Sequence, residues 1–126
     1  MNQEQAYQFA DEWISAFNAH DLTAILDHYA DELKFYSPFI PQLKFNESGC
    51  ITSKRDLERY FQLSLATYLN LHFTLHNVFV GIDTLAIYYT SVNDRLACEV
   101  FQLNEQGKAA IIYCHYAMTK SIPEKA

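Results

Sequence analysis

The first part of the chain has apolar residues at steps of three and four, which is typical of amphipathic helices. A helix is expected over residues 3–19, followed by a short second helix after Asp21 and a third after Ser53. Side-chain oxygens of Asp and Ser can cap the free backbone N–H groups that begin a helix. The inner faces should carry Ala6, Phe9, Ala10, Trp13, Ile14 and Phe17 in the first helix, Leu22, Ile25, Leu26 and Tyr29 in the second, and Leu57, Tyr60, Phe61, Ser64, Leu65 and Tyr68 in the third.

After Asn70 the hydrophobic period falls to about two, which indicates strands. Four are expected, at residues 71–80, 84–92, 95–103 and 109–119, besides a short earlier strand at 33–37 that Pro38 ends. Residues 38–52 contain two prolines and one glycine and form either a flap over a pocket or a plain connection. Helices followed by an antiparallel meander exclude a parallel doubly wound sheet. We therefore predict one α+β domain over residues 1–126, with three N-terminal helices packed on a strongly curved mixed or antiparallel sheet.

The two sides of the meander are both apolar, which bears on its partners. If Asn93 and Asp94 form a two-residue hairpin turn, Tyr88 faces Glu99 and lies on the same side of the sheet as Phe101. A sheet with one side in water should show a polar side. We therefore expect the helices to cover one side and a second copy of the chain to cover the other, as a homodimer through the outer sheet face.

Composition narrows the function. The chain is 50% hydrophobic and 15% aromatic, enough for a core and for the lining of a cavity. Its net charge of −6 argues against nucleic acid and anionic membranes as partners. Apolar runs are too short to cross a bilayer, and the polar N-terminus does not resemble a secretory signal, so we expect a cytoplasmic protein. Three cysteines without C-x-x-C spacing indicate free thiols rather than disulfides or a zinc site, and no cofactor is expected.

The segment WISAFNAHDLTAILDHYADELKFYSP, residues 13–38, resembles the opening of the nuclear transport factor 2-like superfamily, and in particular its SnoaL-like branch. Later parts agree in order and spacing: Gly49 before a helix, EVFQLNEQG at 99–107, and the closing His115-Tyr116. The resemblance covers about residues 7–117 and is strongest to small, uncharacterised members of the branch. It implies a cone-shaped α+β barrel with a deep apolar cavity, usually as a dimer.

Ketosteroid isomerase shares this fold, and its three catalytic positions can be compared with this sequence one by one. The oxyanion-hole tyrosine position falls on Trp13, and the carboxylate base position falls on Ser37, which cannot act as that base. Only the acid position, which falls on Glu99, keeps suitable chemistry. The comparison therefore argues against ketosteroid isomerisation.

Glu99 is the candidate catalytic residue, because a carboxyl group among apolar neighbours should have a raised pKa and could donate a hydrogen bond or transfer a proton. The alternative is that Glu99 lies on the outer face, in solvent or at a dimer interface. Cys114 and Tyr116 share its face if the Gln106-Gly107 turn has two or four residues, whereas a three-residue loop with a bulge brings Tyr113 and His115 there. The resemblance favours Tyr116. The predicted ligand-binding set is Trp13, Phe17, Tyr36, Ser37, Phe61, Tyr88, Phe101 and Tyr116.

Three functions remain compatible with the sequence. The first is a module that binds a small, largely apolar molecule with Glu99 as its polar anchor. The second is a cofactor-independent lyase, isomerase or cyclase that uses Glu99 with Tyr88 or Tyr116. The third is a structural dimer whose cavity is filled by its own side chains.

Overall fold

The structure, a computed structural model, describes residues 1–118 of the 126-residue chain. Its elements are α1 (Gln3–Asn18), α2 (Leu22–Leu26), β1 (Tyr29–Tyr36), α3 (Phe39–Gln42), β2 (Cys50–Ser53), α4 (Lys54–Thr67), β3 (Thr74–Val80), β4 (Thr84–Thr90), the 3-10 turn η1 (Val92–Asp94), β5 (Leu96–Leu103) and β6 (Ala109–Tyr116). The strands form one sheet in the order β2-β1-β6-β5-β4-β3. Only β1 and β6 pair in parallel, so the sheet is mixed. The predicted α+β class is confirmed.

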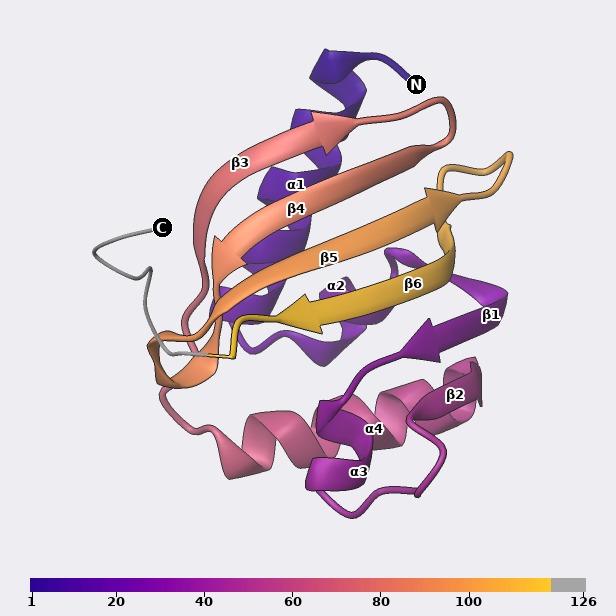
Figure 1. The fold of residues 1–126 in the computed structure, drawn as a ribbon. Helices are drawn as coiled ribbons and strands as arrows, with labels where there is room; N and C mark the ends of the chain where they lie inside the picture. The colour runs from indigo at the N-terminus through magenta and orange to yellow at the C-terminus, as the bar shows by residue number, and fades with distance from the viewer. Residues whose placement is uncertain (119–126) are drawn as a thin grey trace.

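Helices cover one side of the sheet. Figure 1 shows α1 crossing behind β3, β4 and β5, while α4 and α3 lie below β1 and β6 in that view. The buried apolar side chains of α1 and α4 and the inner side chains of the strands form one core between these layers. None of the helices in residues 1–118 is long and apolar enough to cross a membrane.

The helix starts follow the sequence closely. The Asp21 carboxylate accepts a hydrogen bond from the Ala24 backbone N–H at 3.1 Å, and the Ser53 hydroxyl accepts one from Asp56 N–H at 3.1 Å. Both predicted caps are confirmed. The second helix is shorter than expected, however, because it ends at Leu26 and Tyr29 already begins β1.

The irregular segment 38–52 contains two elements that the periodicity did not predict. The four-residue helix α3 begins just after Pro38, whose fixed φ suits the start of a helix. Strand β2 follows at Cys50–Ser53 and pairs with β1. Both elements are too short to produce a recognisable hydrophobic repeat. Residue 119, the expected end of the last strand, lies outside the described residues, and β6 ends at Tyr116.

The predicted register between β4 and β5 is wrong by one residue. Glu99 pairs with Ile87 rather than with Tyr88. Asn93 and Asp94 do adopt the positive φ expected of them, 56° and 58°, but the buried Val92 joins the turn as a third residue. A one-residue change turns every side chain of a strand to the other face relative to its neighbour. Tyr89 therefore lies on the face of Glu99, and Tyr88 lies on the outer face.

The turn between β5 and β6 has three residues, 105–107, with Gly107 at φ 74°. Such a loop by itself would bring Tyr113 opposite Glu99. A bulge changes this, because Gln102 pairs with Ile111 and Leu103 with Ala109, so that Ala110 has no partner. The extra residue places Cys114 opposite Glu99. The expectation that a three-residue loop with a bulge would bring Tyr113 and His115 to this face is wrong, because the bulge at Ala110 lies within β6 and shifts the register by one residue.

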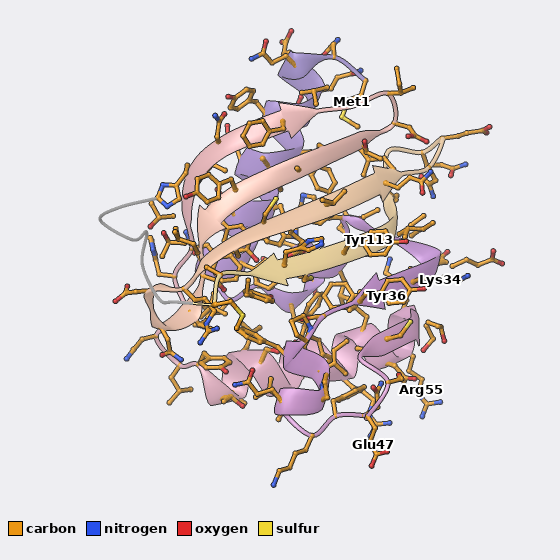
Figure 2. The ribbon with its side chains drawn as sticks, in the orientation of Figure 1. Met1, Lys34, Tyr36, Glu47, Arg55 and Tyr113 are labelled. Atoms are coloured by element: carbon orange, nitrogen blue, oxygen red, sulfur yellow. The ribbon has the colours of Figure 1, made fainter. Side chains whose placement is uncertain are left out.

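The outer face of the sheet carries a row of mostly apolar residues. Their backbones pair across five neighbouring strands in the order Phe79, Ala86, Val100, Tyr113 and Tyr36. The rings of Tyr36 and Tyr113 stack at 5.1 Å, on the side of the sheet that faces the viewer in Figure 2. The outer sheet face is where a second copy was expected to bind, although the predicted register had placed Ala86 on the inner face and Tyr36 was expected at the cavity.

Candidate functional site

An interior cavity of about 50 Å³ lies between the sheet and the helices. Its lining is mainly aromatic and comes from α1, α4, α3, the loop before β3, and the inner faces of β1, β4, β5 and β6. The lining residues are Trp13, Phe17, Phe35, Phe39, Tyr60, Phe61, Ser64, Tyr68, Leu71, Phe73, Tyr89, Ser91, Val92, Glu99 and Tyr116.

Among the residues that the structure describes, Glu99 is the only one with a carboxyl group in this lining. Its residue is 3% exposed, and the Tyr89 hydroxyl donates a hydrogen bond to its Oε1 at 2.9 Å. Burial raises the pKa of Glu99 to about 7, although hydrogen bonds from Tyr89 and Cys114 act in the opposite direction. Desolvation penalises the charged form more than these two donors stabilise it. The carboxyl group can therefore hold or release a proton near neutral pH.

A second polar group, the Ser37 hydroxyl, lies next to Cys114, which in turn neighbours Glu99. The Ser37 hydroxyl accepts the Phe39 backbone N–H at 3.2 Å. Burial raises the pKa of Tyr60, Tyr116 and Cys114, and the neighbouring Ser37 hydroxyl partly offsets this for all three. Cys114 in turn contacts Glu99. Polar groups thus run along one wall of a cavity whose other walls are aromatic.

The deep wall is closely packed around Trp13. Its indole N–H donates to the Tyr29 hydroxyl at 3.0 Å, so this donor is already occupied. The indole meets Tyr89 and Phe101 nearly edge-on, with ring centroids 5.3 and 5.4 Å apart. Trp13 is therefore a wall of the cavity rather than a free hydrogen-bond donor in the position of an oxyanion-hole tyrosine.

The structure brings together most of the residues selected from the sequence. Glu99 and four of the predicted ligand-binding residues line the cavity, namely Trp13, Phe17, Phe61 and Tyr116. Phe101 is fully buried behind Trp13, and Ser37 lies next to the polar wall.

Two residues of the predicted set lie elsewhere. Tyr36 stacks on Tyr113 on the outer face, and the Tyr88 ring lies 5.2 Å from that of His76. Their predicted place at the cavity is wrong. Tyr36 follows Phe35, which lines the cavity, on the alternating strand β1 and therefore points to the opposite side, while Tyr88 was misplaced by the register error.

Sequence reasoning missed Tyr89, the hydrogen-bond partner of Glu99. The missing signal was the length of the β4–β5 turn, because a three-residue loop would have paired Tyr89 with Ala97 beside Glu99. Phe39 was missed because α3 has no repeat. Tyr60 was placed correctly on the inner face of its helix, and only its role at the cavity was not foreseen.

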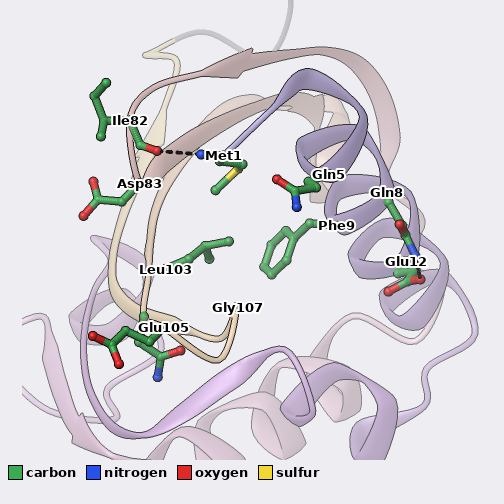
Figure 3. Close-up of a pocket in the computed structure, with 11 residues that line it drawn as sticks. Met1, Gln5, Gln8, Phe9, Glu12, Ile82, Asp83, Leu103, Glu105 and Gly107 are labelled. Atoms are coloured by element: carbon green, nitrogen blue, oxygen red, sulfur yellow. Dashed lines mark hydrogen bonds between the residues drawn. The ribbon is translucent and has the colours of Figure 1, made fainter.

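A larger hollow of about 490 Å³ opens to solvent at another part of the surface. Figure 3 shows it between the N-terminal half of α1 and the turns after β3 and β5, with Phe9 and Leu103 toward its base. Glu12, Asp83 and Glu105 are exposed at its edge. The interior cavity differs from this hollow because its carboxyl group, Glu99, is buried away from water.

The cavity has the chemistry of a single acid. The described residues contain no group of three side chains able to hold a metal ion. Cys50, Cys98 and Cys114 are free thiols, as predicted. One proton-bearing carboxyl group, assisted by a tyrosine and set in an aromatic enclosure, can anchor an oxygen atom of an apolar molecule or exchange a proton with it.

Comparisons with known proteins identify the family. The family model described as a SnoaL-like domain matches residues 10–112. The chain belongs to the SnoaL-like family. A crystal structure of a SnoaL-like protein of unknown function from Burkholderia thailandensis E264 is 40% identical, with a TM-score of 0.88 over 92% of this chain and 97% of that one.

More distant structures show the breadth of the fold. SalBIII, an epoxide hydrolase/cyclase-like enzyme of pyran ring formation in the polyether salinomycin, is 17% identical, with a TM-score of 0.74 over 94% of this chain and 95% of its own. A nuclear transport factor 2-like protein from Anabaena variabilis ATCC 29413 is 12% identical, with a TM-score of 0.72 over 94% and 92%. The SnoaL-like chain thus has a nuclear transport factor 2-like fold, as expected from its sequence. No curated protein matches it.

Proposed function

We propose that this SnoaL-like protein binds a small, largely apolar molecule in its interior cavity and anchors one oxygen of that molecule on Glu99. The observation that carries the proposal is a buried carboxyl group, hydrogen-bonded by Tyr89 and Cys114, in the lining of a mainly aromatic cavity. In its neutral form Glu99 can donate to a carbonyl or ether oxygen. In its charged form it can accept from a hydroxyl group.

The size of the cavity limits how the ligand is held. A volume of about 50 Å³ has room for a few water molecules, since one needs roughly 10–15 Å³. The deep aromatic side chains, such as Trp13 and Phe61, are almost fully buried, whereas Phe39, Ser64, Tyr68 and Tyr116 are half-buried. A ligand would therefore enter and widen the cavity on the side of these four residues, which we call the mouth.

Cofactor-independent catalysis as a lyase, isomerase or cyclase is a second candidate. It is favoured by the pKa of Glu99, about 7, because general acid–base catalysis works best when the pKa lies near the working pH. Tyr89 and Tyr116 are the hydroxyl groups best placed to assist. SalBIII, an enzyme of pyran ring formation, shares the fold, but at 17% identity it supports the fold alone. Binding remains the first proposal, because within residues 1–118 the cavity lining contains no second carboxyl group and no imidazole group.

Native mass spectrometry of the protein purified from its own host tests binding. We expect a retained small molecule on the wild-type chain and weaker retention on Glu99→Gln, with unchanged retention on Glu47→Gln, an exposed control. Retention that is equal in all three proteins would contradict the role of Glu99. If Glu99→Gln retains the molecule fully but no longer converts it, the enzyme is the better description. A chain that never carries or binds a small molecule would support a cavity that serves packing alone.

We also propose that two copies associate through the outer row. Phe79 and Tyr113 are 55% and 47% exposed, although both side chains are large and mostly apolar. The row spans five strands. On the same face, the backbone of Lys34 pairs with that of Ile111, next to the pair of Tyr36 and Tyr113. Burying such a row against a second copy would remove its apolar area from water, at about 25 cal/mol per Å².

A further inference from the structure

The mouth of the cavity contains an aromatic contact unlike the others around it. The rings of Phe39 on α3 and Tyr116 at the end of β6 are 4.0 Å apart and nearly parallel, at 8°. Deeper in the cavity, Trp13 meets Phe17 at 4.8 Å and 57°, and Phe73 meets Tyr89 at 4.8 Å and 50°. Trp13 and Phe73 are nearer to parallel, at 25°, but their ring centroids are 5.6 Å apart. Phe39 and Tyr116 therefore form a closer and more parallel contact than these deep pairs, and Phe39 covers one face of the Tyr116 ring.

The two sides of this stack are held differently. Tyr116 belongs to β6, and its backbone pairs with Ala97 in the interior of the sheet. Phe39 is the first residue of a four-residue helix that is anchored by its neighbour, the fully buried Ile40. Rotation about the side-chain bonds of Phe39 would uncover Tyr116 without moving Ile40 or the sheet.

From this arrangement we infer that Phe39 occupies the place of a ligand ring. A flat, conjugated molecule displaces the Phe39 side chain, stacks on Tyr116 and extends an oxygen toward Glu99. This rests on the proposed binding function and names the ligand class: planar rings carrying an oxygen, in preference to saturated, puckered rings. Face-to-face and offset stacking rewards flat rings specifically, and displacing Phe39 costs the stacking that it now makes.

Two matched alcohols test the inference, because they share a carbon skeleton and differ in flatness: 2-naphthol and decahydro-2-naphthol. Affinities are measured by isothermal titration calorimetry for the wild type, Phe39→Ala, Tyr116→Leu and Phe45→Ala. Phe45 is a half-buried phenylalanine of the same segment whose ring contacts Tyr60, and it is not part of the cavity lining, so it controls for loss of an aromatic ring.

We expect Phe39→Ala to bind 2-naphthol about two- to twelvefold more tightly than the wild type, since the stack worth about 0.5–1.5 kcal/mol no longer has to be broken. The affinity of Phe39→Ala for the saturated alcohol should increase less. Tyr116→Leu should bind the two alcohols with similar affinity, and Phe45→Ala should bind both as the wild type does. Phe39→Leu, which keeps apolar volume without a flat ring, should give an intermediate gain if Phe39→Ala proves unstable.

The possible results distinguish the displacement of Phe39 by a flat ring from ligand binding in the cavity as such. Equal gains for both alcohols in Phe39→Ala, or no gain for 2-naphthol, would overturn the ring exchange and leave interior binding standing. Binding of neither alcohol to Phe39→Ala would overturn both. A ligand-free check is acrylamide quenching of Trp13, the only tryptophan, which lines the same cavity. Phe39→Ala should increase quenching, and Phe45→Ala should not.

Discussion

The burial of Glu99 has a measurable consequence for stability, which the substitution Glu99→Gln isolates. Burial raises the pKa of this carboxyl group from 4.5 to about 7 in the folded chain. Between these values the folded state holds a proton that the unfolded state has lost, so the free energy of unfolding falls as the pH rises. Glutamine has a similar shape, can still accept the Tyr89 hydrogen bond and does not titrate.

The magnitude follows from the two pKa values. Each pKa unit corresponds to about 1.4 kcal/mol, so the ionisation of Glu99 should destabilise the wild type by about 3 kcal/mol at pH 8 and about 1 kcal/mol at pH 5. Relative to the wild type, the free energy of unfolding of Glu99→Gln should therefore rise by about 2 kcal/mol between pH 5 and pH 8. Because every other group is common to both proteins, the difference reports Glu99 alone.

Urea unfolding followed by Trp13 fluorescence, at pH 5 and pH 8 and at one protein concentration, measures the difference. Trp13 is the only tryptophan and is buried in the folded chain, so its emission should follow unfolding. Glu47→Gln, at an exposed position, is the control and should leave the wild-type pH dependence unchanged. If Glu99→Gln and the wild type lose stability in parallel between the two pH values, Glu99 is not a buried neutral acid, and the reasoning behind the site fails.

Three further predictions concern single contacts. Tyr89→Phe removes the donor to Glu99 and should raise the pKa of that carboxyl group further; the same urea titrations should show a loss of about 1.5–3 kcal/mol at pH 8 and less at pH 5. Ser53→Ala removes the cap of α4 and should cost about 1 kcal/mol at both pH values, measured by urea unfolding, whereas Ser53→Asp should retain most of the stability. Tyr113→Lys places a charge in the middle of the outer row; sedimentation should show dimers of the wild type and 14.6 kDa monomers of the variant at micromolar concentration. Wild-type monomers under these conditions would disprove the dimer.

Much of the fold was readable from local signals. The caps at Asp21 and Ser53 act within one helical turn, and the inner face of α1 follows from its repeat. The burial of Glu99 was indicated by its apolar neighbours along the strand. These properties depend on residues close together in the chain, so the sequence by itself determined them.

Tertiary structure decided which side chains meet Glu99. The inclusion of Val92 in one turn and the bulge at Ala110 near another each shift a register by one residue, and each shift reverses a face. Residue preferences at the turns allow more than one loop length, and the choice depends on how buried side chains such as Val92 pack. The stacking of Phe39 on Tyr116 likewise joins residues 77 positions apart, through the parallel pairing of β1 and β6. Such contacts exist only once the sheet has formed, because the whole core selects one register among those that the local sequence permits.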